Sequence, residues 1–137
     1  MNISFSKSKD EMDADYIHSF LTESYWSKGI SREKVQKCID NSLNFGIFLG
    51  GKQIGYARVL TDRVRFAYLM DVFIEPELQG KGYAQMLMKY IFSDKIIKEL
   101  PSMMLGTKDA HSLYEKFGFK ELTEEQKQRF MFYKKED

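Results

Sequence analysis

The stretch Ile74-Glu75-Pro76-Glu77-Leu78-Gln79-Gly80-Lys81-Gly82-Tyr83-Ala84 decides the fold class of this 137-residue chain. An apolar run ends at Ile74, a glycine-rich turn follows, and apolar residues with helical spacing begin at Ala84. The N-terminus of a helix presents unpaired N–H groups and a partial positive charge, so this position favours an anion. Because glycines let the backbone approach a phosphate closely, we expect the turn to hold a pyrophosphate.

The spacing of the glycine turn separates it from two other phosphate-binding motifs. A P-loop has four residues between its glycines and then Lys and Ser or Thr, an arrangement that this turn lacks. A dinucleotide fingerprint needs a small residue three positions after its second glycine, and Gln85 stands there. The pattern that fits is Gln/Arg-x-x-Gly-x-Gly/Ala, through Gln79, Gly82 and Ala84. An ordinary tight turn before a core helix is the structural alternative.

A second motif follows at residues 110–119, which read Ala-His-Ser-Leu-Tyr-Glu-Lys-Phe-Gly-Phe. It resembles the signature Ala-x-x-Leu-Tyr-x-Lys-x-Gly-Phe of the GNAT superfamily of acetyl-CoA-dependent N-acetyltransferases. The glycine turn resembles the acetyl-CoA loop of the same superfamily. The two patterns occur in the order of that family, and the resemblance extends over residues 2–134.

The resemblance implies an activity as well as a fold. Residues 1–137 would form a single N-acetyltransferase domain that moves the acetyl group of acetyl-CoA to a primary amine, by direct attack in a ternary complex. The acceptor would be a small molecule or a peptide, and a homodimer is a family expectation. The alternative is a non-catalytic acyl-CoA-binding or sensor module on the same fold.

Hydrophobic periodicity along the chain predicts a mixed α/β fold with the element order β-α-α-β-β-β-α-β-α-β-β. Strands are expected at residues 2–6, 45–49, 54–60, 64–74, 103–105, 119–122 and 130–133, with a solvated connection at residues 124–128. Helices are expected over residues 10–21, after Ser31, from Ala84 to Phe92, and from Ala110 to Phe117 with Asp109 as cap. The resemblance implies a central, largely antiparallel sheet with splayed parallel strands and helices on both faces.

Composition narrows the class of protein further. The 21 Lys and Arg against 20 Asp and Glu leave a net charge of +1, without the basic excess of a dedicated nucleic-acid binder. One cysteine and two histidines favour neither a disulfide framework nor a metal site, so we expect no metal. No apolar run is long enough to span a membrane, and the first residues lack the apolar run of a signal peptide. We therefore expect a cytoplasmic protein that does not contact a membrane.

The resemblance also assigns the residues that would hold acetyl-CoA. Val72, Phe73 and Ile74 would offer backbone groups to the pantetheine arm and the thioester carbonyl. Thr107 stands where many members of the family carry an Asn that binds the pantetheine. Gln79 would brace the loop. The cradle for the pyrophosphate would consist of the backbone amides of Gly80, Lys81, Gly82, Tyr83 and Ala84.

Tyr114 matches the tyrosine that the family places beside the sulfur of coenzyme A, where it would act as the acid for the leaving thiol. A tyrosine has a reference pKa of about 10 and a thiol one of about 8.5, so full proton transfer is uphill by about 2 kcal/mol. Tyr114 would then only hydrogen-bond the departing sulfur, unless its pKa is lowered. Because Tyr114 also lies on the apolar stripe of its expected helix, a core tyrosine is the alternative.

Two residues of the strand before the glycine turn are candidates for the base. Asp71 is an acid within an otherwise apolar run, where a charge costs free energy unless it is paired or hydrated. It would act as a base, bind the charge of the amine, or pair with Arg58 or Arg65. Tyr68 is the second candidate, since some GNAT members place their base there. Strand alternation predicts that Tyr68 and Met70 lie on the face opposite Asp71.

Aromatic residues after the first expected helix are candidates for the acceptor pocket, which the family places between the first helices and the sheet. Tyr25 and Trp26 would hold an amine by cation–π contact, with core packing as the alternative. His18 would act as a base or lie as a satisfied surface residue. The sequence leaves the acceptor open among a polyamine, an aminoglycoside, an amino acid, an arylalkylamine and a protein amine.

Overall fold

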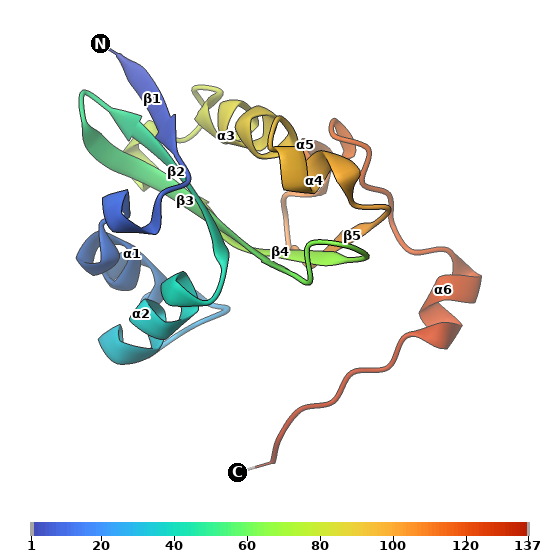
Figure 1. The fold of residues 1–137 in the computed structure, drawn as a ribbon. Coiled ribbons are helices and arrows are strands. Elements are labelled where there is room, and N and C mark those ends of the chain that lie inside the picture. Colours follow the sequence, from blue (N-terminus) through green and yellow to red (C-terminus); the bar gives the residue numbers. More distant parts are fainter. Residues whose placement is uncertain (1, 137) are drawn as a thin grey trace. The chain divides into compact units, whose positions relative to one another are not determined.

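The computed structural model describes residues 2–136, and the chain divides into two compact units, residues 1–107 and 108–137 (Figure 1). The strands of the first unit are β1 (Ile3–Ser6), β2 (Leu43–Leu49), β3 (Lys52–Thr61), β4 (Ala67–Ile74) and β5 (Met103–Leu105). Its helices are α1 (Ala14–Leu21), α2 (Arg32–Asp40), α3 (Tyr83–Phe92) and α4 (Lys95–Glu99), with short 3-10 turns η1 (Lys9–Glu11) and η2 (Pro76–Leu78). Within the described residues, no helix has the length and apolar character to cross a membrane.

The sheet of the first unit has five strands in the order β1-β2-β3-β4-β5. Neighbouring strands pair antiparallel, except that β4 and β5 are parallel. Gly50 and Gly51 close the β2–β3 hairpin with φ of 58° and 82°, the conformation that a tight two-residue hairpin turn needs. This mixed, largely antiparallel sheet confirms the predicted fold class.

Helices α1 and α2 cover one face of the sheet (Figure 1). The Asp13 side chain caps α1 by accepting from the Tyr16 amide, and the Ser31 side chain caps α2 by accepting from the Lys34 amide, as the sequence predicted for Ser31. The apolar sides of these helices pack on residues of β3 and β4. The buried cluster consists of Met12, Ile17, Leu21, Val35, Ile39, Tyr56 and Phe73.

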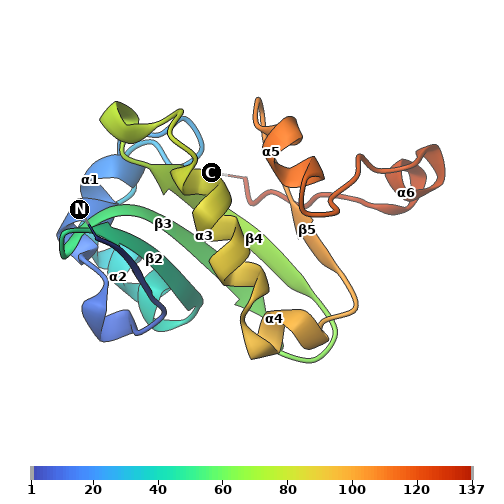
Figure 2. The ribbon, with the colours of Figure 1, turned by 90° about the horizontal axis from the view of Figure 1, so that it is seen from above.

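Helices α3 and α4 cover the other face of the sheet (Figure 2). Leu87, Met88 and Ile91 of α3 are buried, as the helical spacing of the apolar residues predicted. Helix α4 was not expected from the sequence, although Asp94 caps it by accepting from the backbone amides of its first turn. Helices on both faces confirm the predicted layers.

Strand β4 begins at Ala67 rather than at Val64, where the sequence predicted its start. The Asp62 side chain accepts from the amides of Val64, Arg65 and Phe66. These three bonds form a tight turn that keeps the three residues out of the sheet.

The second unit contains α5 (His111–Glu115) and α6 (Glu124–Arg129). The prediction of strands at residues 119–122 and 130–133 is wrong, because the structure has no strand in residues 108–136. Thr123 and Gln126 form a capping box, which starts α6 where a solvated connection was expected. Alternating apolar residues form a strand only when a partner pairs with their backbone groups, and the sequence pattern does not supply that partner.

Helix α5 is shorter than the sequence predicted. Ala110 occupies its N-cap instead of Asp109, and no side chain caps its first turn. At its end, Gly118 has a φ of 94°, and its amide donates to the carbonyl oxygen of Glu115. Gly118 thus supplies a left-handed residue in the turn that follows the helix.

Candidate functional site

The glycine turn lies between the end of β4 and the start of α3. Gly80 and Gly82 have φ of 79° and 87°, in the left-handed region, and Gly82 is the N-cap of α3. A Cβ on either glycine would meet no atom within 4 Å, so the backbone is open to an approaching group. Because the N-cap is a glycine, no cap side chain occupies the first amides of α3, and these amides suit a phosphate.

Gln79 connects the glycine turn to β4. Its Nε2 donates to the carbonyl oxygen of Ile74 over 3.1 Å, which ties the beginning of the turn to the last residue of β4. Lys81 is exposed at the centre of the turn, and Tyr83 and Ala84 are half-buried in the first turn of α3. The turn is therefore held to β4 at Gln79, is exposed to solvent at Lys81, and continues into α3 at Tyr83.

Strands β4 and β5 pair over only part of the length of β4. Their register runs from Ala67 opposite Met103 to Leu69 opposite Leu105, and β4 continues to Ile74. Beyond Leu69, β4 has β3 as its strand neighbour on one side and no strand on the other side within residues 2–136. This separation agrees with the splayed parallel strands that the resemblance implied, and it leaves one edge of β4 without a strand partner beyond Leu69.

Thr107 and Tyr114 follow β5 in the chain. Thr107 is half-buried at the end of the first unit. Tyr114 lies in α5 of the second unit, where its ring meets that of Phe119 edge-on with the ring centroids 5.9 Å apart. The role of Tyr114 beside the cofactor stays a prediction.

Asp71 lies at an irregularity in β4. The register between β3 and β4 shifts between Tyr56 and Arg58, so that one extra residue of β4 bulges out, and Asp71 has a φ of 57°. Aspartate is one of the few residues besides glycine that adopt this conformation. The bulge explains how an acid within an apolar strand turns toward polar partners.

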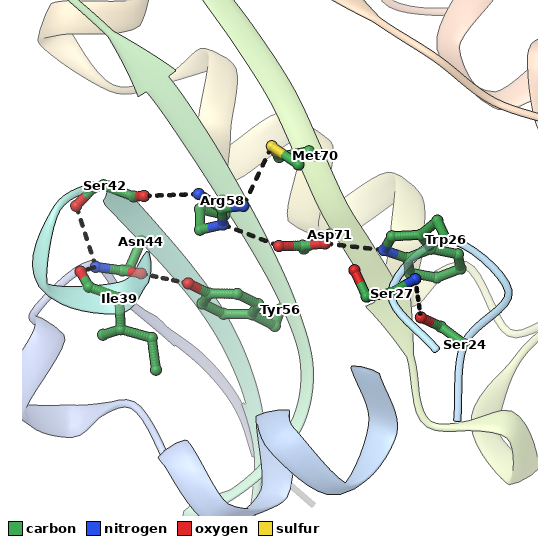
Figure 3. Close-up of polar contacts among 10 residues, drawn as sticks. All are labelled: Ser24, Trp26, Ser27, Ile39, Ser42, Asn44, Tyr56, Arg58, Met70 and Asp71. Carbon is green, nitrogen blue, oxygen red and sulfur yellow. Dashed lines mark hydrogen bonds and ion pairs between the residues drawn. The ribbon is translucent and has the colours of Figure 1, made fainter. Parts of the chain in front are cut away.

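Two donors hold the two oxygens of the Asp71 carboxylate (Figure 3). Arg58 Nε donates to Oδ2 over 2.8 Å and forms a buried ion pair, and Trp26 Nε1 donates to Oδ1 over 2.8 Å. Of the contacts considered for Asp71, the structure shows the pairing with Arg58. It also brings together two of the predicted substrate-binding residues, Asp71 and Trp26.

The guanidinium of Arg58 is held by two further groups. Its Nη1 donates to Ser42 Oγ over 3.1 Å, and its Nη2 donates to Met70 Sδ over 3.2 Å. In the same region the Tyr56 hydroxyl donates to Asn44 Oδ1, and burial raises the pKa of Tyr56 (Figure 3). Buried polar groups of β2, β3 and β4 therefore satisfy one another instead of remaining unpaired.

The alternation predicted for β4 is wrong at the bulge. Met70 and Asp71 both reach the Arg58 guanidinium, so they share one face of the sheet. The extra residue at the bulge shifts the alternation by one position. Tyr68, two residues before Met70, lies on that same face, and a Cβ on Gly106 would be 3.2 Å from its hydroxyl. The two candidate bases therefore lie on the face that carries α1 and α2.

The segment between α1 and α2 carries the aromatic residues predicted for the acceptor. Tyr25 and Trp26 are 62% and 40% exposed, so core packing does not account for them. Their rings meet edge to face with centroids 5.1 Å apart. His18 Nε2 lies 3.1 Å from the carbonyl oxygen of Ile30, which ties α1 to the far end of this segment. His18 thus has the backbone contact expected of a satisfied residue.

A row of aromatic rings connects this segment with β4. Phe20 lies with its centroid 6.2 Å from that of Trp26, and it stacks on Phe73 at 3.9 Å. Tyr16 also packs on Phe73, and its hydroxyl donates to Glu75 Oε2 over 2.6 Å. Burial, together with this hydrogen bond, raises the pKa of Tyr16, so its hydroxyl stays protonated and acts as a donor. The rings link the exposed Trp26 to the strand end where the thioester was expected.

A narrow pocket lies beside the Arg58–Asp71 pair. Apolar residues of α1 and α2 line it, together with Tyr56, Arg58 and Asp71. The pocket has no room for a water molecule. The ion pair therefore borders closely packed apolar side chains on this side, which is consistent with the low exposure of both residues.

Sequence reasoning missed part of this site. Arg58 was expected only as one of two partners for Asp71, and the contact between Tyr16 and Glu75 was not expected. A signal for Arg58 exists, because it is a lone charge within an apolar run and such a charge needs a buried partner. No local signal joins Tyr16 to Glu75, which are 59 positions apart.

Comparison with known proteins agrees with this geometry. A family model described as an acetyltransferase (GNAT) domain matches residues 40–121, more than half of the chain. The crystal structure of a candidate acetyltransferase of the GNAT family from Xanthomonas campestris pv. campestris is similar with a TM-score of 0.92 and 36% identity, covering 98% of this chain and 94% of that chain. A curated candidate acetyltransferase of Gibberella zeae is 24% identical, over 82% of this chain and 76% of that protein.

A third similar protein, from Clostridium acetobutylicum, is assigned as an acetyltransferase and was crystallised with acetyl-CoA. It shares the fold, with a TM-score of 0.69 and 16% identity, covering 90% of this chain and 93% of that chain. The family match over residues 40–121 and the similarity to the Xanthomonas protein decide the assignment. The chain belongs to the GNAT family of acetyltransferases.

Proposed function

We propose that residues 1–137 act as one N-acetyltransferase domain, which moves the acetyl group of acetyl-CoA to a primary amine by direct attack in a ternary complex. The observation that carries this proposal is the glycine turn at the start of α3, which follows the strand whose edge lacks a strand partner beyond Leu69. The acetyl-CoA complex of the Clostridium protein, which has the same fold, supports the choice of co-substrate. The acceptor is a small molecule or a peptide that carries the amine.

The residues of the first unit fit coenzyme A. Because Gly80 and Gly82 are left-handed with open space in place of side chains, the amides from Gly80 to Ala84 can approach a pyrophosphate. The edge of β4 near Phe73 offers backbone groups to the pantetheine arm, and Thr107 offers a hydroxyl. Since backbone amides supply this binding, a net charge of +1 is sufficient for a polyanionic ligand.

Acetyl-CoA supplies an activated thioester when it is bound. A bond forms between the amine nitrogen and the acetyl carbon, the carbon–sulfur bond breaks, and coenzyme A leaves as a thiol or thiolate. An alkylamine with a pKa of about 10.4 is almost wholly protonated at pH 7, so a base or a dry pocket has to remove its proton before attack. A backbone amide of β4 near Phe73 stabilises the charge that develops on the thioester oxygen.

Tyr114 is the proposed acid, from its match to the family motif. Tyr68 is the proposed base, because it lies on the acceptor face of β4 and Asp71 has both of its carboxylate oxygens occupied. His18 is a weaker candidate for the base, since its Nε2 already contacts a backbone carbonyl oxygen. In this proposal Tyr114 and Tyr68 transfer the protons, and Asp71 does not act as the base.

Two measurements test this proposal. Isothermal titration calorimetry with acetyl-CoA is expected to show binding to one site on each chain. An assay of thiol release with a panel of primary amines is expected to show release that depends on the amine. Binding without amine-dependent release would leave a non-catalytic acyl-CoA-binding module, and the absence of binding would overturn both alternatives.

A further inference from the structure

We infer that Arg58, Asp71 and Trp26 form a positioning device for the acceptor amine. Arg58 holds the Asp71 carboxylate, the carboxylate holds the ring of Trp26, and Trp26 forms a wall for an amine with a flat, apolar body. This inference rests on the proposed function and deepens it by naming the class of acceptor. Asp71 is here a positioning residue, and Trp26 is a specificity-determining residue.

The Arg58–Asp71 ion pair is buried, and further hydrogen bonds hold the guanidinium. Arg58 and Asp71 are 7% and 6% exposed, and Arg58 Nε lies 2.8 Å from Asp71 Oδ2. Ser42 and Met70 accept from the other two nitrogens of the guanidinium. A buried carboxylate with such partners keeps its position, because leaving them would forfeit a charge-assisted hydrogen bond.

Trp26 is anchored through its indole nitrogen and is partly exposed. Its Nε1 donates to Asp71 Oδ1 over 2.8 Å, while 40% of the residue is exposed. The rings of Tyr25 and Phe20 lie near its ring, with centroids 5.1 Å and 6.2 Å away. An aromatic ring that is held through its polar atom presents apolar surface to a ligand with little further loss of conformational entropy.

The charges around Trp26 select against a polycation. Both oxygens of Asp71 accept hydrogen bonds, and Arg58 neutralises its charge. The Glu75 carboxylate accepts from a neutral tyrosine hydroxyl, which brings it no positive charge, whereas Glu23, on the segment that carries Trp26, is in an ion pair. A polyamine or an aminoglycoside would need several unpaired carboxylates, whereas one amine on a flat body needs an aromatic wall. The geometry therefore favours an arylalkylamine-like acceptor.

The choice of acceptor is tested by steady-state kinetics with 2-phenylethylamine and spermidine. We expect kcat/KM for 2-phenylethylamine to exceed that for spermidine at least about tenfold, and Trp26→Ala to raise the KM for 2-phenylethylamine about tenfold with kcat changed less than about threefold. Phe66→Ala is the matched control, because Phe66 is an apolar residue of similar exposure, 42%, in the turn before β4. A preference for spermidine, or a KM that Trp26→Ala leaves unchanged, overturns the inference.

The positioning role of Asp71 is tested by fluorescence, because Trp26 is the only tryptophan of the chain. We expect Asp71→Ala to lower the fluorescence anisotropy of Trp26, increase its quenching by acrylamide, and raise the KM for 2-phenylethylamine as Trp26→Ala does. Asp71→Asn keeps an oxygen for the indole N–H and should restore most of the wild-type anisotropy. Because Asp71→Ala leaves Arg58 unpaired, the double variant Arg58→Met, Asp71→Ala is measured as well.

A second buried carboxylate provides the control for this experiment. Asp94 pairs with Lys7 over 2.6 Å and caps α4, on the face of the sheet opposite α1 and α2. Asp94→Asn should therefore leave the anisotropy of Trp26 unchanged. Equal anisotropy in wild type, Asp71→Ala and the double variant would overturn the positioning role.

Failure of this inference differs from failure of the proposed function. If acetyl-CoA does not bind to the wild-type protein in calorimetry, the proposed function and the acceptor role fail together. If acetyl-CoA binds and amines release thiol, but the variants at Trp26 and Asp71 behave as wild type, only the inference fails.

Discussion

The Asp71 carboxylate pairs with the Arg58 guanidinium over 2.8 Å, and both side chains are buried between neighbouring strands and the helices that cover them. The bulge in β4 makes this pairing possible, because it turns Asp71 to the face that already carries Arg58. Each charge offsets the cost of burying the other. The second carboxylate oxygen of Asp71 accepts from Trp26 Nε1, so the buried pair also holds the segment that carries the proposed acceptor residues.

Removal of Arg58 should destabilise the first unit strongly. Arg58→Met leaves the buried Asp71 carboxylate without its cation, and the expected loss in the free energy of unfolding is about 3 kcal/mol. The measurement is urea denaturation of wild type, Arg58→Met, and the double variant Arg58→Met, Asp71→Asn. The double variant should recover part of the loss because it no longer buries a charge. A loss below about 1 kcal/mol in Arg58→Met would show that the pair is not buried as described.

Replacement of Gly82 by alanine should weaken acetyl-CoA binding beyond what the loss of stability alone explains. Gly82 has a φ of 87°, which costs an L-residue about 1–2 kcal/mol and displaces the amides at the start of α3. Gly51→Ala is the matched control, because Gly51 has a φ of 82° and, like Gly82, has no atom within 4 Å of an added Cβ.

The two glycine variants should lose similar amounts of stability in denaturation. Only Gly82→Ala should weaken acetyl-CoA binding in calorimetry, by at least about tenfold, which is about 1.4 kcal/mol. Equal affinities for acetyl-CoA in Gly82→Ala and Gly51→Ala would remove the glycine turn from the cofactor site.

The Lys7–Asp94 pair should stabilise the protein over a wide but limited range of pH. Its hydrogen bond to Asp94 raises the pKa of Lys7 above 10.5. Burial raises the pKa of Asp94, but the hydrogen bonds from Lys7 and the backbone amides outweigh it and hold the pKa below 3.8. The pair therefore contributes to the free energy of unfolding at pH values between the folded pKa of Asp94 and the folded pKa of Lys7. This contribution is lost as pH falls through the first or rises through the second.

The measurement is the difference in the free energy of unfolding between wild type and Lys7→Met as a function of pH. We expect a plateau from about pH 5 to about pH 9 and a smaller difference at both ends. A difference that changes steadily through neutral pH would contradict the assignment to this pair.

Replacement of Tyr114 should lower turnover without weakening the binding of acetyl-CoA. Tyr114→Phe removes the hydroxyl proposed to serve the leaving sulfur and keeps the ring that packs on Phe119. The expected loss in kcat is at least about tenfold, because a hydroxyl that only hydrogen-bonds the departing sulfur contributes less than full general acid catalysis does, which is about 10²–10⁴-fold. Undiminished turnover in Tyr114→Phe would remove this residue from the mechanism.

The parts of the fold that depend on short spacings could be predicted from the sequence. The glycine turn, the buried stripe of α3 and the cap at Ser31 all follow from residues that are close in the chain. The bulge at Asp71 depends on how β4 aligns with β3, and alternation along one strand cannot show it. For this reason the face of Tyr68 relative to Asp71 was predicted wrongly.

Long-range contacts limited the prediction of the site and of the last elements. Trp26 and Asp71 were both expected at the acceptor, but their hydrogen bond joins positions 45 apart and has no local signature. The strands expected at residues 119–122 and 130–133 failed for a related reason, since a strand exists only with a partner. The capping box at Thr123 and Gln126 was a local signal for α6 that the strand pattern outweighed in the prediction.

The most direct test of the central claim is the release of coenzyme A thiol from acetyl-CoA by the wild-type protein, with and without an added primary amine. The account predicts release that depends on the amine, with one acetylated amine, identified by mass spectrometry, for each thiol released. Binding of acetyl-CoA with the same slow thiol release in the presence and absence of every amine tested would contradict it.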